Sequence, residues 1–301
     1  MADTNERPTG APTPAPDRVV VGVDGSQHSL RALDRAADEA ALRGAELEVL
    51  CGGAPPRRSV VPETDGDRER ARQASREVAE AGARRAHERR PELSVLASGV
   101  TASAPDALVR ASREAVLTVV GTRGRGGFRG LLLGSVGLRV AAHAAGPLLV
   151  VRGEEPAPSA PQRETVVGLK WAGATETVAF GFEEAARDGS RLRVVHAWTY
   201  PVLPGQALKL PPNEPTEEGQ AAEEFLRETV EPYRERYPDV RVTTEQHRGP
   251  TAEHLIDLSA GASVIVLGVR REHRRLGLQV GPVVNAVLQH ARCSVALVPV
   301  E

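Results

Sequence analysis

The sequence predicts an α/β protein made of two tandem, doubly wound domains, each a parallel sheet with helices on both faces. Three observations support this prediction. Short apolar runs of strand length alternate with segments of helical periodicity along the chain. Landmarks of the first half recur in the second half at an offset of 146 or 147 residues. The length of 301 residues also agrees with two domains of roughly 150 residues each.

The internal repeat sets the domain organisation. Three pairs of segments share their apolar and glycine pattern: 18–24 with 164–170, 115–121 with 262–268, and 147–151 with 294–298. Several landmarks at nearly constant offset indicate a tandem duplication. The Pro-rich segment 153–162 is therefore expected to link a first domain, 17–152, to a second domain, 163–301.

Strands and helices alternate regularly in the first half. Its five strand-length runs lie at 19–23, 47–50, 93–97, 116–120 and 148–151. Ser26 is a suitable N-cap for the first helix, and Gly44 ends it. A long charged helix is expected over 68–90, and Ser103 opens the next helix in a capping-box-like pattern. The Arg/Glu-rich helix is interpreted as a solvated face with charge pairs.

The second half repeats this order. A helix with Val178 and Phe182 on one face ends at Gly189, and strands follow at 192–195 and 240–244, on either side of a helix over 217–236. Short links between alternating strands and helices predict a parallel sheet in each half. Ligands of such sheets bind at the carboxyl ends of the strands, at the topological switch point.

Composition excludes several classes of protein. Apolar residues make up 41% and charged residues 26%, with a net charge of −2, so nothing in the total charge favours nucleic acid or an anionic membrane. Residues 1–16 are expected to be a flexible tail because they lack the apolar core of a signal peptide. Cys51 and Cys293 are expected to be buried free thiols, in keeping with the cytoplasm. No membrane segment is expected.

Asp24 directly follows the first predicted strand, where the chain turns sharply into a helix. A carboxylate in that place can accept hydrogen bonds from a ribose or from a base amine. The same Asp-Gly-Ser sequence is also an ordinary turn and N-cap, so this residue alone leaves both interpretations open.

A Gly- and Arg-rich segment follows the strand at 116–120. Gly121, Gly124 and Gly134 let the backbone approach an anion closely, and Ser135 adds a hydroxyl at a helix N-terminus. The segment also contains three arginines that could balance phosphate charge, Arg123, Arg125 and Arg129. A flexible loop without a ligand would be glycine-rich too, but Phe128 and the leucines at 131–133 favour a loop that packs down.

The pattern Gly-x2-Gly-x9-Gly-Ser, formed by Gly121, Gly124, Gly134 and Ser135, resembles that of ATP-binding universal stress proteins. The segment 20–26 and the ending from His143 to 151 are similar to the same family. The resemblance covers both halves. It implies a five-stranded parallel sheet in each domain, with ATP at its carboxyl edge and Mg²⁺ compatible with the phosphates.

The resemblance also implies a role for each site residue. Asp24 would meet the ribose or adenine, and Val23 and Val120 would lie near the base. The backbone of Gly121 and Gly124 would approach the phosphates. The remaining members of the expected ATP site are Gly134, Ser135, Val136 and Arg123. The resemblance further implies that the final strands, 148–151 and 295–298, face each other in a pseudo-dimer, and a homodimer of the tandem chain is compatible with it.

The second half keeps the fold pattern but departs from the site pattern. Lys170-Trp171 stands where the first half has Asp24-Gly25, Arg271 stands at the position of Gly124, and Pro282 replaces Ser135. These changes predict a nucleotide in the first domain alone. The alternative is a second site for a different anion, with four arginines as its candidates: Arg270, Arg271, Arg274 and Arg275.

These patterns predict an ATP-binding stress-response regulatory protein whose nucleotide controls conformation or contact with a protein partner. Two alternatives stay open: a slow ATPase or nucleotidyl-transfer enzyme, and an interaction scaffold without nucleotide. No catalytic residue is expected, because no nucleophile motif, Walker A lysine or pair of carboxylates is present. No metal ligands are expected either, because the histidines show no ligand spacing.

Overall fold

The computed structural model describes residues 17–53, 64–124, 133–153, 163–170, 174–198, 217–270 and 280–300. The strands are β1 (Arg18–Gly22), β2 (Glu46–Gly52), β3 (Val95–Val100), β4 (Leu117–Gly121), β5 (Leu148–Val151), β6 (Glu164–Leu169), β7 (Arg191–Trp198), β8 (Val242–Arg248), β9 (Val264–Arg270) and β10 (Ser294–Val300). The helices are α1 (Gln27–Arg43), α2 (Asp65–Arg89), α3 (Ala104–Ala111), α4 (Ser135–His143), α5 (Ala174–Asp188), α6 (Glu217–Arg236), α7 (Thr251–Leu258) and α8 (Pro282–His290).

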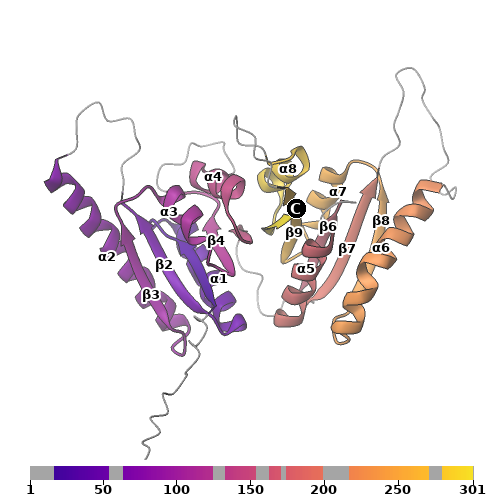
Figure 1. Cartoon of the computed structure of the whole chain (residues 1–301), viewed down its shortest axis with the longest axis horizontal. Helices are drawn as coiled ribbons and strands as arrows, with labels where there is room; N and C mark the ends of the chain where they lie inside the picture. The colour runs from indigo at the N-terminus through magenta and orange to yellow at the C-terminus, as the bar shows by residue number, and fades with distance from the viewer. Residues whose placement is uncertain are drawn as a thin grey trace, which may run out of the picture.

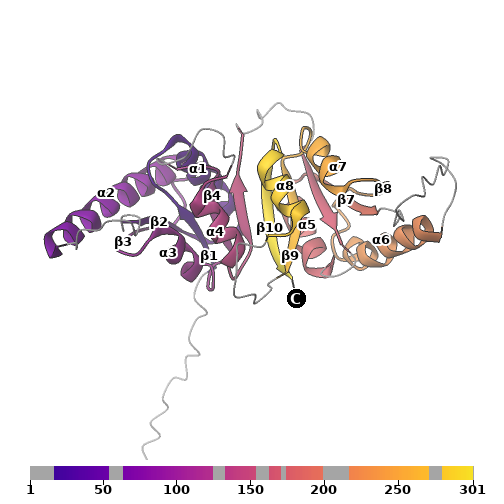
Figure 2. The same ribbon diagram turned by 90° about the horizontal axis from the view of Figure 1, so that it is seen from above.

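The strands of both halves form one sheet in the order β3-β2-β1-β4-β5-β10-β9-β6-β7-β8. Neighbouring strands within each half are parallel, and β5 and β10 pair antiparallel at the centre of the molecule (Figure 1, Figure 2). The predicted α/β class with two tandem, doubly wound units is confirmed, and so is the expected meeting of the two final strands. The residues alone did not predict that the two sheets become continuous.

The junction between β5 and β10 is apolar on both faces of the sheet. Leu148 pairs with Leu297 and Val150 with Val295, and all four side chains are buried. Side chains that alternate along these strands enter two separate cores, one on each face of the sheet. Helices α1, α2, α5 and α6 cover one core, and α3, α4, α7 and α8 cover the other. Each core therefore extends through both halves.

The helix boundaries follow the predicted capping residues. Ser26 accepts a hydrogen bond from the backbone N–H of Ser29 and caps α1, which ends at Gly44 with a φ of 62°. Ser103 caps α3 in the same way, through the N–H of Asp106. Cys51 and Cys293 are buried free thiols, as expected. In the described part of the chain, no helix is long and apolar enough to cross a membrane.

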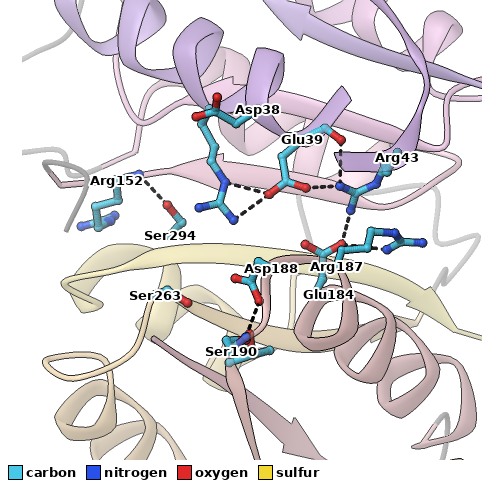
Figure 3. Close-up of polar contacts among 12 residues, drawn as sticks. Asp38, Glu39, Arg43, Arg152, Glu184, Arg187, Asp188, Ser190, Ser263 and Ser294 are labelled. Carbon is cyan, nitrogen blue, oxygen red and sulfur yellow. Dashed lines mark hydrogen bonds and ion pairs between the residues drawn. The ribbon is translucent and has the colours of Figure 1, made fainter. Parts of the chain in front are cut away.

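Helices α1 and α5 contact each other across the pseudo-dimer through buried charges (Figure 3). Arg43 of α1 binds both Glu39 of its own helix and Glu184 of α5. Arg35 adds a second contact to Glu39, at 2.6 Å, and Arg187 reaches Glu184 at 3.2 Å. Burial, followed by repulsion from Glu39, raises the pKa of Glu184 to about 7.

Replacing Glu184 by Gln tests this buried contact. Because the pKa of Glu184 is raised in the folded state, its contribution to stability is complete below pH 4.5 and is lost as the pH rises through 7. We expect the wild type to lose about 1–3 kcal/mol more unfolding free energy between pH 5 and pH 8 than Glu184→Gln loses. Thermal unfolding at both pH values measures the difference. Equal losses in the two proteins would contradict the raised pKa.

Candidate functional site

The turn after β1 is built around Asp24. One carboxylate oxygen, Oδ1, accepts a hydrogen bond from the backbone N–H of Ser26 at 3.0 Å. The backbone N–H of Asp24 donates to the Oγ of the buried Ser29 at 3.2 Å. The N–H of Val23 donates to the carbonyl oxygen of Leu50, so this turn is also tied to the end of β2. These bonds hold the carboxylate at the carboxyl end of the sheet.

The glycine motif lies beside this turn. A Cβ on Gly121 would come within 2.5 Å of the carbonyl oxygen of His28, and one on Gly124 within 2.3 Å of Asp24 Oδ2. Both positions therefore need glycine for close approach. The N–H of Gly134 donates to the carbonyl oxygen of Thr122 at 2.7 Å, which closes the base of the loop. Helix α4 starts directly afterwards at Ser135, without a side-chain cap.

These two segments border a cavity of about 760 Å³, within the usual range of a small-molecule site. All the residues expected from the sequence line it: Val23, Asp24, Val120, Gly121, Arg123, Gly124, Gly134, Ser135 and Val136. Leu133 is fully buried. Phe128, Arg125 and Arg129 lie outside the described residues, and the placement expected for them stays a prediction.

The cavity is polar at one end and apolar along its walls. At the polar end, the first backbone N–H groups of α4 lack partners within the helix and point outward with the positive end of the dipole. Arg123 lies at the same end, and its Nε is buried without a hydrogen-bond partner among the described residues. The apolar walls come from Val23, Val120 and Leu108. Such a site suits a ligand with one anionic end and one flat, apolar end.

The cations around the cavity also act on a histidine nearby. His28 Nδ1 accepts a hydrogen bond from Arg31 at 2.8 Å and lies 3.3 Å from the hydroxyl of Thr122. Burial lowers the pKa of His28, and the charges of Arg31 and Arg123 lower it further, against the opposing effect of Asp24. His28 is therefore neutral near pH 7 and leaves the positive charge of the site to the arginines.

Sequence reasoning missed a third wall of the cavity. Helix α2 contributes a stripe of small side chains at helical spacing: Ala71, Ala74, Ser75 and Val78. The spacing i, i+3, i+4, i+7 marks one helix face and could have been found among the charged residues. Gly52 and Gly53 at the end of β2 line the same cavity. A Cβ on Gly52 would lie 2.4 Å from the backbone nitrogen of Ala104, so α3 packs against this glycine.

The second half fills the corresponding region with larger side chains. By strand register, His196 occupies the position of Cys51, and Trp198 that of Gly53. His196 is 2% exposed, donates through Nδ1 to the carbonyl oxygen of Leu169, and contacts the ring of Phe225 edge-on. Burial lowers the pKa of His196, so the ring is neutral. At these two positions the second half thus carries the rings of His196 and Trp198, where the first half has the small residues Cys51 and Gly53.

The glycine segment of the second half is also paired differently. Strand β9 continues to Arg270 and pairs with β10 as far as Val300, whereas β4 stops at Gly121. The pairing with β10 therefore holds the backbone of Val269 and Arg270, which would otherwise be available to turn toward an anion. Lys170 is exposed. Trp171 and the candidate anion ligands Arg271, Arg274 and Arg275 lie outside the described residues, so that alternative stays a prediction.

The structure brings together three side chains that could hold a metal ion, a grouping that the spacing of the histidines does not suggest. Glu245 and His247 of β8 and His254 of α7 each place a ligand atom within 4.8 Å of the other two. The spacing along the sequence does not reveal this group, because His247 lies in β8 and His254 lies in α7, with Gly249 between the two elements.

Comparisons with known proteins find relatives that match both halves of the chain. The sequence model of the Universal stress protein family matches twice, at residues 16–152 and 166–299. A universal stress protein of Mycobacterium tuberculosis is 34% identical over 292 residues, which cover 92% of this chain and 95% of that protein. One from Mycolicibacterium smegmatis is 30% identical over 293 residues, 93% and 96% of the two chains.

Solved structures agree in fold. The crystal structure of a universal stress protein from Archaeoglobus fulgidus aligns with a TM-score of 0.71 at 15% identity, covering 94% of this chain and 98% of its own. A universal stress protein in complex with cAMP aligns with 46% of this chain and 98% of its own at 34% identity, with a TM-score of 0.34. The first likeness extends over both halves of the sheet.

Two glycine substitutions test how tightly the cavity wall is packed. Gly52→Ala places a methyl group against the backbone of α3 and is expected to lower the free energy of unfolding by about 1–3 kcal/mol. Gly66→Ala in α2 is the matched control, because the nearest atom lies 3.8 Å away, and alanine is expected to be neutral or to stabilise by up to about 1 kcal/mol. Urea unfolding of both variants measures this. A Gly52→Ala protein as stable as wild type would contradict the packing.

Proposed function

Because the chain belongs to the universal stress protein family, we propose that its first domain, residues 17–152, binds ATP and that the nucleotide acts as a regulatory switch. The observation that carries this proposal is the cavity of about 760 Å³ between the turn at Asp24 and the start of α4. It joins a carboxylate, an apolar wall and an anion-binding helix end in one place. An adenine nucleotide needs these three features together.

Each part of the cavity suits one part of the nucleotide. Asp24 can accept hydrogen bonds from ribose hydroxyls or the adenine amine, while Val23 and Val120 offer apolar contact to the base. The backbone N–H groups of Ser135 and Val136, in the first turn of α4, can donate to phosphate oxygens, and Arg123 can balance the phosphate charge. Asp24 is the one carboxylate among the described lining residues, so any Mg²⁺ would be held chiefly by the phosphates.

We infer that the second domain, residues 163–301, binds no nucleotide. Lys170 replaces the carboxylate, His196 and Trp198 replace small lining residues, and Pro282 removes a backbone donor at the helix start. The second domain instead supplies β10, on which the last strand of the first domain pairs.

In this proposal, the nucleotide acts on the junction between the domains through α4 and β5. The phosphate end of the cavity is the start of α4, and α4 leads straight into β5. Since β5 is the strand that pairs with β10, a nucleotide that tightens α4 would act on the junction between the domains. A protein partner that contacts both domains would sense this change.

Equilibrium binding of labelled ATP tests the proposal. Wild type should bind one ATP per chain. Asp24→Ala should weaken binding by about 10- to 100-fold through loss of charged hydrogen bonds. Gly124→Glu should weaken it by about 100-fold or more, because the new side chain collides with Asp24 and repels the phosphates.

Lys170→Ala is the matched control, since Lys170 holds the position of Asp24 in the second domain. It should bind ATP as wild type does. Absence of ATP binding by wild type would overturn the proposal, and two nucleotides per chain would overturn the inference about the second domain. If wild type releases phosphate from ATP well above the level of Gly124→Glu, the protein is an enzyme rather than a switch.

A further inference from the structure

We propose that Glu245, His247 and His254 form a binding site for a divalent transition metal of the zinc class in the second domain. Two imidazole nitrogens and one carboxylate oxygen are a ligand set that Zn²⁺ uses with a fourth, open position. The three ligand atoms come from the edge strand β8 and from α7, and all lie within 4.8 Å of one another. A metal bound here would tie the edge of the sheet to the helix that covers it.

The distances are close to those that a metal requires. His254 Nε2 and Glu245 Oε1 are 2.7 Å apart, and the rings of His247 and His254 stack at 3.7 Å with an interplanar angle of 2°. Ligand atoms around a tetrahedral Zn²⁺ are roughly 3.4 Å apart for bonds of about 2.1 Å. Because stacked rings direct their in-plane lone pairs side by side, the histidine rings must rotate for the His–Glu hydrogen bond to be exchanged for a shared metal.

Neighbouring groups orient the ligands. Arg193 Nη1 donates to the other oxygen of Glu245, Oε2, at 3.0 Å and leaves Oε1 directed toward the histidines. Glu164 binds the same arginine at 3.1 Å, so a second carboxylate compensates the positive charge beside the site. A partner that fixes a ligating carboxylate is typical of metal sites.

The ligand atoms are open to an ion. The absence of a Cβ at Gly249 leaves room at His247 Nε2, since a Cβ there would lie 2.8 Å from this nitrogen. The three side chains are partly buried, which leaves them accessible to an ion from solution.

The first half of the chain lacks this ligand set. The strand registers of Val95 with Leu47 and of Val242 with Leu192 align the two copies. At the aligned positions, the first half has Ser98, Val100 and Ala107 in place of Glu245, His247 and His254. The second copy therefore differs at three positions that meet in space, and all three differences introduce a metal ligand.

Calorimetric titration of the tag-free, full-length protein with Zn²⁺ at pH 7 tests the site. Wild type should bind one Zn²⁺ per chain, and His247→Gln, His254→Gln and Glu245→Gln should each weaken binding by about 10- to 100-fold or more. His87→Gln is the matched control, because His87 is an exposed histidine of α2, and it should bind as wild type does. Zn²⁺ should raise the Tm of wild type and of His87→Gln and leave that of His254→Gln unchanged.

Two outcomes would overturn the proposal: wild type that binds no Zn²⁺, and ligand variants that bind it as tightly as His87→Gln. Either would mean that His254 and Glu245 form only a hydrogen bond. Should one variant fail to fold, the spectrum of Co²⁺ bound to wild type decides. Intense visible bands of a four-coordinate ion support the site, and the weak bands of a six-coordinate ion contradict it.

Discussion

The antiparallel pairing of β5 with β10 is the constraint on which the rest of the structure depends. Each strand has only one parallel neighbour in its own half, β4 or β9, so each would be an exposed, apolar edge without the other. Their pairing buries Leu148, Val150, Val295 and Leu297 and makes both cores continuous from one half to the other. Neither half can therefore bury its final strand fully by itself. The first domain therefore needs the second domain to cover its last strand, whether or not the second domain binds a ligand.

This requirement explains which parts of the duplicated sequence diverge. Positions that build the sheet stay buried in both copies, as in the runs at 117–120 and 264–267, in which Thr118 is the one polar residue. Positions at the carboxyl ends of the strands do not serve the junction and are free to change. Cys51 and Gly53 line a cavity, whereas His196 and Trp198 occupy the matching region of the second copy. At the next strand, β3 has Val100 where β8 has the ring of His247. One copy has small residues around a space, and the other has rings and potential ligands.

The sequence predicts local features well because they depend on neighbouring residues. Ser26 and Gly44 mark the ends of α1 since capping and a positive φ are properties of single positions. The glycine motif could be located for the same reason, as could the final strands. The face of α2 that carries small side chains is not apparent from the sequence, because exposed arginines and glutamates dominate the pattern of this helix. The contact between Arg43 and Glu184 and the group at Glu245 depend on how separate elements pack, which no local spacing encodes.

The charged contact between α1 and α5 shows how a duplicated interface becomes specific. Aligned on the helix ends at Gly44 and Gly189, Glu39 and Glu184 are the same position in the two copies. In a symmetric pairing, two buried carboxylates would face each other and repel. The copies differ four residues further on, where α1 has Arg43 and α5 has Asp188, and Arg43 binds both glutamates. A buried ion pair adds little net stability, but leaving one carboxylate without its cation is costly. The apolar junction thus provides the stability of the pseudo-dimer, and Arg43 of the first domain gives Glu184 the cation that Asp188 cannot provide.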